Sequence, residues 1–349
     1  MLSVLKLYLS VKMFMKYALL FMISGILMHC TNPAPSVTEA KTDKSFPITL
    51  VIHGGAGTIT RENLSPEKEQ AYRVKLKEAI DSGYAQLATG KTSIEAVVTV
   101  VSMLEDSPLF NAGKGAVFTN EGKNELDASI MDGQTLMAGA VAGVTNIKNP
   151  IKAALTVMTK SPHVMLVGSG AEQFAAEHGL EIVDPSYFKD AIRYERWKKE
   201  HEKKQESSDK KFGTVGCVAL DRFGNIAAGT STGGMMNKKW GRIGDSPIIG
   251  AGTYAKNTTC GISATGWGEY FMRLAIAYDI SAQIEYGGRS LEEAAAETIM
   301  KKLPDLGGDG GIIALNQQGE IVMKFNTAGM FRGYKRQGEE AKTFLFRDE

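Results

Sequence analysis

The sequence predicts an α+β fold in which two β-sheets lie between two layers of helices. Residues 66–84 and 93–104 have the apolar spacing of amphipathic helices. From residue 214 onward, strand–turn–strand patterns recur at residues 214–232, 248–264 and 311–325. Helices that cover the outer faces of two packed sheets would bury the apolar side of every one of these elements.

In the first half of the chain, the pattern indicates a strand and then a series of helices. Residues 48–53 (ITLVIH) form a short apolar strand that runs into glycines. Ser65 is a capping residue directly before Pro66, and apolar residues then recur four apart, at Tyr72, Leu76, Ile80 and Tyr84. Ser93 starts the next helix. Further helices are expected at residues 149–159, 170–178 and 185–200.

In the second half, two helices separate the strand pairs, at residues 269–286 and 290–303. Ser290 and Glu293 have the spacing of a capping box, and Pro304 marks the expected end of that helix. The chain shows no internal repeat and no low-complexity domain.

Composition excludes several classes of function. The 349 residues include 43% hydrophobic and 23% charged residues, as in an ordinary globular protein. The net charge is +1, which gives no reason to expect a nucleic acid as partner. Cys30, Cys217 and Cys260 form neither a CxxC motif nor a cluster with zinc-ligand spacing.

Residues 1–30 have the character of a signal peptide. Three lysines, the last of them Lys16, precede an uncharged run at residues 17–28 that is too short to span a bilayer comfortably. The run ends at Cys30 and is followed by a linker, residues 31–46. This resembles a bacterial lipoprotein signal in which Cys30 is lipidated, although His29 departs from the expected small residue. We therefore expect an exported protein, periplasmic or membrane-anchored, with a plainly cleaved signal as the alternative.

The junction between Gly213 and Thr214 differs from the rest of the chain. Residues 197–211 (WKKEHEKKQESSDKK) contain almost no apolar residue, which predicts a disordered tether. A Gly–Thr bond then begins a strand, and this arrangement indicates a chain that cleaves itself there. Cleavage would leave Thr214 with a free α-amine of pKa about 7.7–8.0, which can act as the base for its own hydroxyl. Residues 47–213 and 214–349 would be two parts of one domain.

The hairpin after this junction predicts a partner for Thr214. With a turn centred on Phe223, the numbers of paired residues sum to 446, which places Thr232 opposite Thr214. Paired residues have Cβ atoms about 4.5–5.5 Å apart, so a second hydroxyl would lie beside the first. Taken alone, the hairpin is equally typical of an ordinary pair of threonines on neighbouring strands.

A series of motifs extends over residues 47–335. They are HGGAGTI (53–59), LEDSPLFNAGKGAVFT (104–119), ELDASIMDG (125–133), AGAVAGV (138–144), SPHVMLVGSGAE (161–172), the long stretch from GTVGCVALD to GAGTYA (213–255), TGWGE (265–269) and LGGDGGIIAL (306–315). In this order they resemble the plant-type asparaginase/isoaspartyl peptidase family of N-terminal-nucleophile hydrolases. The resemblance implies a four-layer αββα sandwich, self-cleavage, and hydrolysis of L-asparagine or β-aspartyl dipeptides by Thr214 through an acyl-enzyme.

The resemblance also implies roles for further residues. Thr232 would assist Thr214, while the Thr265 hydroxyl and the Gly266 N–H would stabilise negative charge on the substrate carbonyl. Arg242 suits the substrate α-carboxylate, since a guanidinium binds carboxylates in bidentate fashion, and Asp245 suits the α-ammonium. Additional substrate contacts are expected from Asn111, Gly266 and Gly268.

The family resemblance further implies a structural sodium ion, no catalytic cofactor, and a dimer of cleaved αβ units. Sodium is a hard cation that prefers oxygen ligands. It would bind main-chain carbonyls of the loop at residues 104–114. The expected contributors are Leu104, Glu105, Ser107, Phe110, Ala112 and Lys114.

Four alternatives compete with this interpretation. The first alternative is a related glycosylasparaginase. In that branch an Asp precedes the catalytic Thr, whereas this chain has Gly213. The residues after Thr232, Gly233 and Gly234, also differ from those usual in that branch. The G-x-S-x-G match at residues 229–233 lacks the later histidine that an α/β-hydrolase needs. Residues 90–92 (GKT) lack the first glycine and preceding strand of a phosphate-binding loop. A non-catalytic surface lipoprotein is the alternative from another class.

Overall fold

The structure is a computed structural model, and it describes residues 46–202 and 213–349. The expected signal peptide with Cys30, the linker up to residue 45, and residues 203–212 of the expected tether lie outside the described residues. In the part of the chain that is described, no helix has the length and apolar character needed to cross a membrane.

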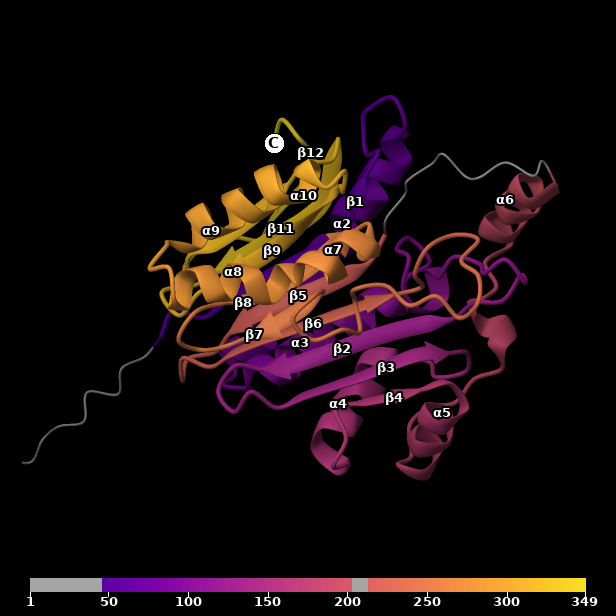
Figure 1. Ribbon diagram of the computed structural model, residues 1–349, viewed down its shortest axis with the longest axis horizontal. Helices are drawn as coiled ribbons and strands as arrows, with labels where there is room; N and C mark the ends of the chain where they lie inside the picture. Colours follow the sequence, from indigo (N-terminus) through magenta and orange to yellow (C-terminus); the bar gives the residue numbers. More distant parts are fainter. Residues whose placement is uncertain (1–45, 203–212) are drawn as a thin grey trace, which may run out of the picture. The chain divides into compact units, whose positions relative to one another are not determined.

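The strands form two sheets (Figure 1). Their bounds are β1 (Thr49–Gly57), β2 (Leu126–Asp132), β3 (Ala138–Val144), β4 (Met165–Val167), β5 (Val215–Leu220), β6 (Ile226–Thr232), β7 (Thr253–Ala255), β8 (Gly261–Gly266), β9 (Gly310–Leu315), β10 (Ile321–Phe325), β11 (Gly329–Arg336) and β12 (Lys342–Phe346). The larger sheet has the order β12-β11-β1-β5-β6-β2-β3-β4, and the smaller one β10-β9-β8-β7. Strands β5 and β6 contact β8 of the other sheet, so the two sheets pack face to face.

Helices cover the outer face of each sheet. They are α2 (Pro66–Ala88), α3 (Ser93–Glu105), α4 (Pro150–Lys160), α5 (Gly168–Glu177), α6 (Ala191–Glu202), α7 (Gly268–Leu274), α8 (Ile276–Glu285), α9 (Leu291–Glu297) and α10 (Leu303–Asp305). Helices α2 to α5 contact the larger sheet, whereas α8 and α9 contact the smaller one. The succession of helix, sheet, sheet and helix confirms the predicted α+β four-layer αββα sandwich.

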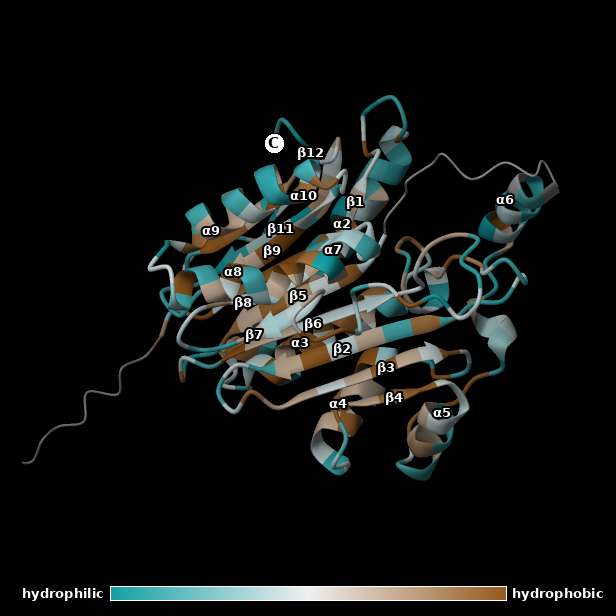
Figure 2. Cartoon of the chain, in the orientation of Figure 1, coloured by the Kyte–Doolittle hydropathy of each residue, from teal (hydrophilic) through white to brown (hydrophobic). Residues whose placement is uncertain are grey.

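The central strands are buried on both faces. In β1, Leu50 and Ile52 belong to the core under the helices, while Val51 between them belongs to the second core, which includes the space between the sheets. Successive side chains of a strand point to opposite faces, so both faces of β1 require apolar residues. The strands accordingly carry many hydrophobic residues, and the outward turns of the covering helices are largely hydrophilic (Figure 2).

Several helix ends agree with the sequence prediction. The Ser65 hydroxyl accepts a hydrogen bond from the Lys68 N–H (3.4 Å), as expected of a cap. Ser290 and Glu293 form the predicted capping box. The helix that follows passes through a π-helical turn, Thr298–Lys302, and ends at Asp305. Pro304 therefore lies in the last helical segment and not after it, because proline is tolerated in the first turn of such a segment.

Three predictions about the elements were wrong. Residues 185–200 are not one helix: a 3-10 turn, Pro185–Phe188, is followed by α6, because the Asp190 carboxylate caps the Arg193 N–H at 2.9 Å. The region of residues 269–286 is divided into α7 and α8 at Ala275, whose φ of 46° is left-handed. The first residues of the expected tether, 197–202, are helical, and the Trp197 ring packs against Tyr194 and Phe118.

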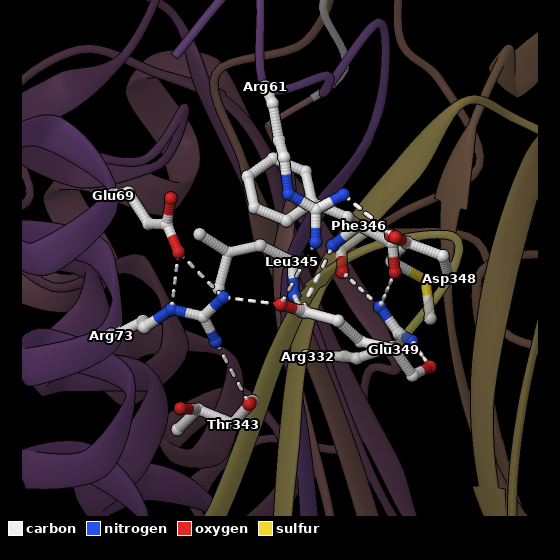
Figure 3. Close-up of polar contacts among 10 residues, drawn as sticks. Arg61, Glu69, Arg73, Arg332, Thr343, Leu345, Phe346, Asp348 and Glu349 are labelled. Atoms are coloured by element: carbon white, nitrogen blue, oxygen red, sulfur yellow. Dashed lines mark hydrogen bonds and ion pairs between the residues drawn. The ribbon is translucent and has the colours of Figure 1, made fainter. Parts of the chain in front are cut away.

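The segments before and after the Gly213–Thr214 bond share one compact unit, Lys44–Glu349. Strand β1 lies between β5 and β11, and β2 pairs with β6. A polar cluster joins them again near the end of β12, where the Glu349 carboxylate accepts hydrogen bonds from Arg73 of α2 and from the Leu345 N–H, and Arg332 donates to the Glu349 carbonyl (Figure 3). A cut at this bond would therefore leave the two parts held together.

Candidate active site

Thr214 lies directly before β5 and is a neighbour of Thr232, the last residue of the paired strand β6. The observed register pairs Val215 with Ser231 and Leu220 with Ile226, so the predicted sum of 446 is confirmed. The two threonine Oγ1 atoms share a hydrogen bond of 3.0 Å in a buried position. Thr232 Oγ1 also accepts the Gly234 N–H at 3.0 Å. That contact fixes the direction of the Thr232 hydroxyl and hence the position of its partner.

The Gly213 carbonyl is held by the predicted loop residue Asn111. The Asn111 N–H donates to Gly213 O at 2.9 Å, and a Cβ atom on residue 213 would lie only 2.7 Å from the Asn111 Cβ. Glycine is therefore required here for close approach of the two backbones. The Asn111 side chain donates to Gly234 O (2.7 Å) and accepts from the Val117 N–H (2.9 Å). It is thus engaged with the protein and does not line the cavity described next.

A small cavity brings together most of the residues that were predicted for the site. Its volume is about 20 Å³, and it is lined by Thr214, Thr232, Gly234, Met235, Arg242, Gly244, Asp245, Ser246 and Gly266. That volume holds about one water molecule and is too small for an amino acid. A substrate as large as an amino acid can therefore enter only if the cavity opens.

Thr265 and Gly266 end strand β8 just before α7. The Thr265 Oγ1 atom accepts the Ala56 N–H at 3.4 Å, which leaves its own hydrogen as a donor. A Cβ atom at residue 266 would lie 2.4 Å from the Phe271 ring and 2.6 Å from Asp309 O, so only glycine fits between them. Gly266 borders the cavity, whereas Thr265 is buried behind it.

Arg242 and Asp245 lie on the loop after β6 and face the same cavity. The Arg242 guanidinium binds the Glu269 carboxylate through Nε and Nη2, each at 2.9 Å. Asp245 is buried, and its Oδ2 has no hydrogen-bond partner among the residues that the structure describes. Burial raises the pKa of Asp245 to about 7, Arg242 opposes this shift, and Glu269 and Asp127 add to it. An unpaired buried carboxyl group of this kind is suited to a cationic ligand.

A buried ion pair behind Thr232 was not anticipated from the sequence. Asp127 on β2 lies opposite Thr232 in the sheet, so both side chains are on one face. Its Oδ1 accepts the Gly143 N–H at 2.8 Å, and its Oδ2 lies 3.9 Å from the Lys238 Nζ. Lys238 also lies 3.4 Å from a carboxylate oxygen of Glu125. The motif ELDASIMDG contained both acids, but only the side-chain distances in the folded chain reveal that they approach Lys238.

Two further buried ionisable groups flank the site. The Nε2 atom of His53 lies 2.9 Å from the Ser263 Oγ, and burial lowers the pKa of His53 to about 3, opposed by a hydrogen bond to the Thr214 backbone. Glu105, at the end of α3, accepts hydrogen bonds from the Ser231 hydroxyl (2.7 Å) and the Ile151 N–H (3.0 Å). Burial raises the pKa of Glu105 to about 8. Both groups take part in buried hydrogen bonds beside the site.

The ligands expected for a cation at residues 104–114 are backbone carbonyl oxygens of the loop. The carbonyls of Leu104 and Ala112 accept turn hydrogen bonds from Ser107 and Gly115, and each retains a second lone pair. Within the described residues, no group of three or more His, Cys, Asp or Glu side chains is arranged to hold a metal ion. The donor set fits a hard alkali ion and does not fit a transition metal.

The fold and the site define a hydrolase of the N-terminal-nucleophile class. The family model described as asparaginase matches residues 46–345. The isoaspartyl peptidase of Salmonella typhimurium is 47% identical over 308 residues, covering 86% of this chain and 98% of the relative. That of Escherichia coli is 48% identical over 309 residues, covering 86% and 96%. The isoaspartyl peptidase/L-asparaginase of Rattus norvegicus is 41% identical over 306 residues, covering 86% and 89%. The chain belongs to the asparaginase family that its motifs resemble.

Proposed function

We propose that this chain is an isoaspartyl peptidase with L-asparaginase activity, which hydrolyses β-aspartyl dipeptides and the side-chain amide of L-asparagine. The observation that carries the proposal is one cavity lined by a paired threonine hydroxyl, Thr214, together with Arg242 and Asp245. A cation and an anion beside a nucleophile match the α-carboxylate and α-ammonium of an amino acid. The names of the relatives agree with this substrate class.

The enzyme activates itself by cleaving the bond between Gly213 and Thr214. The Thr214 Oγ1 atom attacks the Gly213 carbonyl carbon, the C–N bond breaks, and the acyl group moves from nitrogen to oxygen. The broken C–N bond leaves the Thr214 α-amine free. Water then hydrolyses the ester, which releases the Gly213 carboxylate and restores the Thr214 hydroxyl. The Asn111 N–H at 2.9 Å from Gly213 O supports this step, because it would stabilise the negative charge that develops on that oxygen.

Cleavage also accounts for access to the site. The cavity of about 20 Å³ does not admit an amino acid while Gly213 remains attached beside Thr214. Once the ester is hydrolysed, Gly213 is free to leave the immediate surroundings of the Thr214 hydroxyl. The nucleophile and its base then become available together, in the place that the scissile carbonyl occupied.

In turnover, the Thr214 α-amine takes the proton of the Thr214 hydroxyl as Oγ1 attacks the substrate side-chain carbonyl. The Thr265 hydroxyl and the Gly266 N–H donate to the resulting oxyanion, each contributing about 3–4 kcal/mol of transition-state stabilisation. The protonated α-amine returns its proton to the leaving amine or ammonia. Water, activated by the same amine, hydrolyses the acyl-enzyme and releases aspartate. Thr232, 3.0 Å away, holds Oγ1 in position throughout.

Cleavage of sugar–asparagine linkages is the second candidate within this fold. It is disfavoured by Gly213, where that branch has an Asp, and by Gly233 and Gly234 after Thr232. A non-catalytic surface lipoprotein would have no need for Thr214, Arg242 and Asp245 to line one cavity.

The remaining features of the proposal concern the surroundings of the enzyme. A sodium ion would bind the backbone carbonyls of the loop at residues 104–114 and supply structural rigidity there. Two cleaved copies would associate as a dimer of αβ units. Residues 1–30 would direct export to the periplasm or membrane surface, with Cys30 carrying the lipid; the lysines and apolar run of that segment support this.

The decisive experiment combines a denaturing gel with an activity assay. Purified protein should separate into two bands, with the N-terminal sequence of the smaller one starting at Thr214, and should hydrolyse both asparagine and a β-aspartyl dipeptide. A fully active protein that migrates as one band would contradict the mechanism, because the α-amine base would not exist.

A further inference from the structure

Glu269 occupies one defined edge of the Arg242 guanidinium. The Glu269 Oε1 and Oε2 atoms accept from Arg242 Nε and Nη2, each at 2.9 Å. These two nitrogens form the side edge of the planar guanidinium fork. The end edge, made by Nη1 and the other N–H of Nη2, is not used by this ion pair. Arg242 can therefore bind a second carboxylate while it remains paired with Glu269.

Two glycines lie close to the Arg242 guanidinium. A Cβ atom on Gly244 would lie 2.9 Å from Arg242 Nη1 and 3.2 Å from Cζ, so a side chain there would push the guanidinium from its observed position. A Cβ atom on Gly268 would lie 2.8 Å from Arg242 Nη2 and 2.9 Å from Asp245 Oδ1. Gly268 therefore lies close to both the cation and the anion. Its missing side chain preserves the space between them.

The position of Glu269 is set by the same turn. Helix α7 begins at Gly268, two residues after Gly266 at the end of β8, so Glu269 is the second residue of the helix. The backbone that carries the predicted oxyanion donor Gly266 thus also carries the partner of Arg242. The Glu269 side chain is 42% exposed and that of Arg242 is 19% exposed, so the pair lies at the edge of the site and not in the core.

We propose that Glu269 is a positioning residue for substrate recognition, which holds Arg242 by its side edge so that the end edge meets the substrate α-carboxylate. This inference rests on the proposed function and adds a residue to it. If Glu269 merely competed with the substrate α-carboxylate for Arg242, its carboxylate would be expected at the end edge of the guanidinium. Because Glu269 binds the side edge, it orients Arg242 and does not displace the substrate from it.

The test compares Glu269→Ala and Glu269→Gln with the parent enzyme after self-cleavage, on a β-aspartyl dipeptide and on L-asparaginamide, which has no α-carboxylate. Loss of the orienting pair should raise KM for the dipeptide about tenfold in the alanine variant and several-fold in the glutamine variant, with kcat within about twofold. KM for L-asparaginamide should not change. Glu269→Gln preserves the volume of the side chain and so keeps the proposal testable where the alanine variant does not fold.

Glu292→Gln is the matched control. Glu292 is likewise the second residue of a helix, α9, is paired with a lysine, Lys324, and is 52% exposed. The Glu292→Gln variant should have the same kcat and KM as the parent enzyme. A double variant, Arg242→Ala with Glu269→Ala, should be no worse than Arg242→Ala alone, because Glu269 acts only through Arg242.

Three results would overturn the proposal. They are an unchanged or lowered KM in the Glu269 variants, an equal loss on L-asparaginamide, or additive losses in the double variant. Failure of the proposed function would look different, since the parent itself would then neither cleave between Gly213 and Thr214 nor hydrolyse the dipeptide.

Discussion

The Oγ1 atoms of Thr214 and Thr232 lie 3.0 Å apart, and the Gly234 N–H donates to the Thr232 oxygen. This contact joins the residue directly before β5 to the last residue of β6. It gives Thr214 a fixed hydroxyl orientation inside a buried site, which a nucleophile requires if it is to attack a neighbouring carbonyl.

The first prediction concerns the double role of Thr214. Replacing Thr214 by Ala should abolish self-cleavage and hydrolysis together, because one hydroxyl serves both reactions. Thr214→Ser keeps a hydroxyl and an α-amine and should retain cleavage and part of the activity. Mass spectrometry of the purified variants and an assay on a β-aspartyl dipeptide would measure both. Turnover by the alanine variant would show that another group is the nucleophile.

The second prediction separates substrate recognition from self-cleavage. Arg242→Ala should leave cleavage largely intact, because that reaction uses the protein's own backbone. Losing one partner of a desolvated charge pair typically costs 2–5 kcal/mol, so kcat/KM should fall by a factor of about thirty or more. The parent enzyme should lose comparably on substrates whose α-amine is blocked, through Asp245. Equal rates on blocked and free dipeptides would point to an amidase of different specificity.

The third prediction is a pH dependence that originates in Asp245. Because burial raises the pKa of Asp245 to about 7, the carboxylate that binds the α-ammonium is lost as the pH falls through that value. The Thr214 α-amine is protonated over a similar range, with a pKa of about 7.7–8.0. In the parent enzyme, kcat/KM should therefore fall about a hundredfold per pH unit below pH of about 6, but only about tenfold in Asp245→Asn. Identical slopes in parent and variant would exclude this role for Asp245.

The fourth prediction concerns the buried pair behind Thr232. The Lys238 side chain is 1% exposed and lies near Glu125 and Asp127, the second of which is fully buried. Lys238→Met would leave that carboxylate uncompensated and should lower the free energy of unfolding by about 3–5 kcal/mol. Urea unfolding in a Thr214→Ala background, where the chain stays uncut, would measure it.

Lys301→Met provides the control for this measurement. Lys301 is 69% exposed and pairs with Glu297 one helical turn away, so its loss should cost less than about 1 kcal/mol. Adding Asp127→Asn to Lys238→Met should recover part of the lost stability, since the uncompensated charge is then removed. Equal unfolding midpoints for the Lys238 and Lys301 variants would contradict the assignment of a buried ion pair.

Local features of the chain were predictable because they depend on neighbouring residues. The hairpin register followed from the turn residues and from the period-two alternation of side chains, and it correctly placed Thr232 opposite Thr214. The caps at Ser65 and Ser290 followed in the same way, because a capping hydroxyl acts within its own first turn. The division between α7 and α8 was missed, since a single left-handed residue such as Ala275 leaves no trace in helical periodicity.

The sequence by itself determined the nucleophile candidate, its strand partner and the family, because these are properties of contiguous motifs. Only the tertiary structure decided which charged side chains form ion pairs. Arg242 and Glu269 are 27 residues apart in the chain, and Asp127 and Lys238 come from different segments of the fold. Such ion pairs depend on the distances between side chains in space, and a one-dimensional pattern does not encode those distances. The hydrogen bond from the Asn111 N–H to Gly213 O likewise forms only after the loop and the hairpin have packed together.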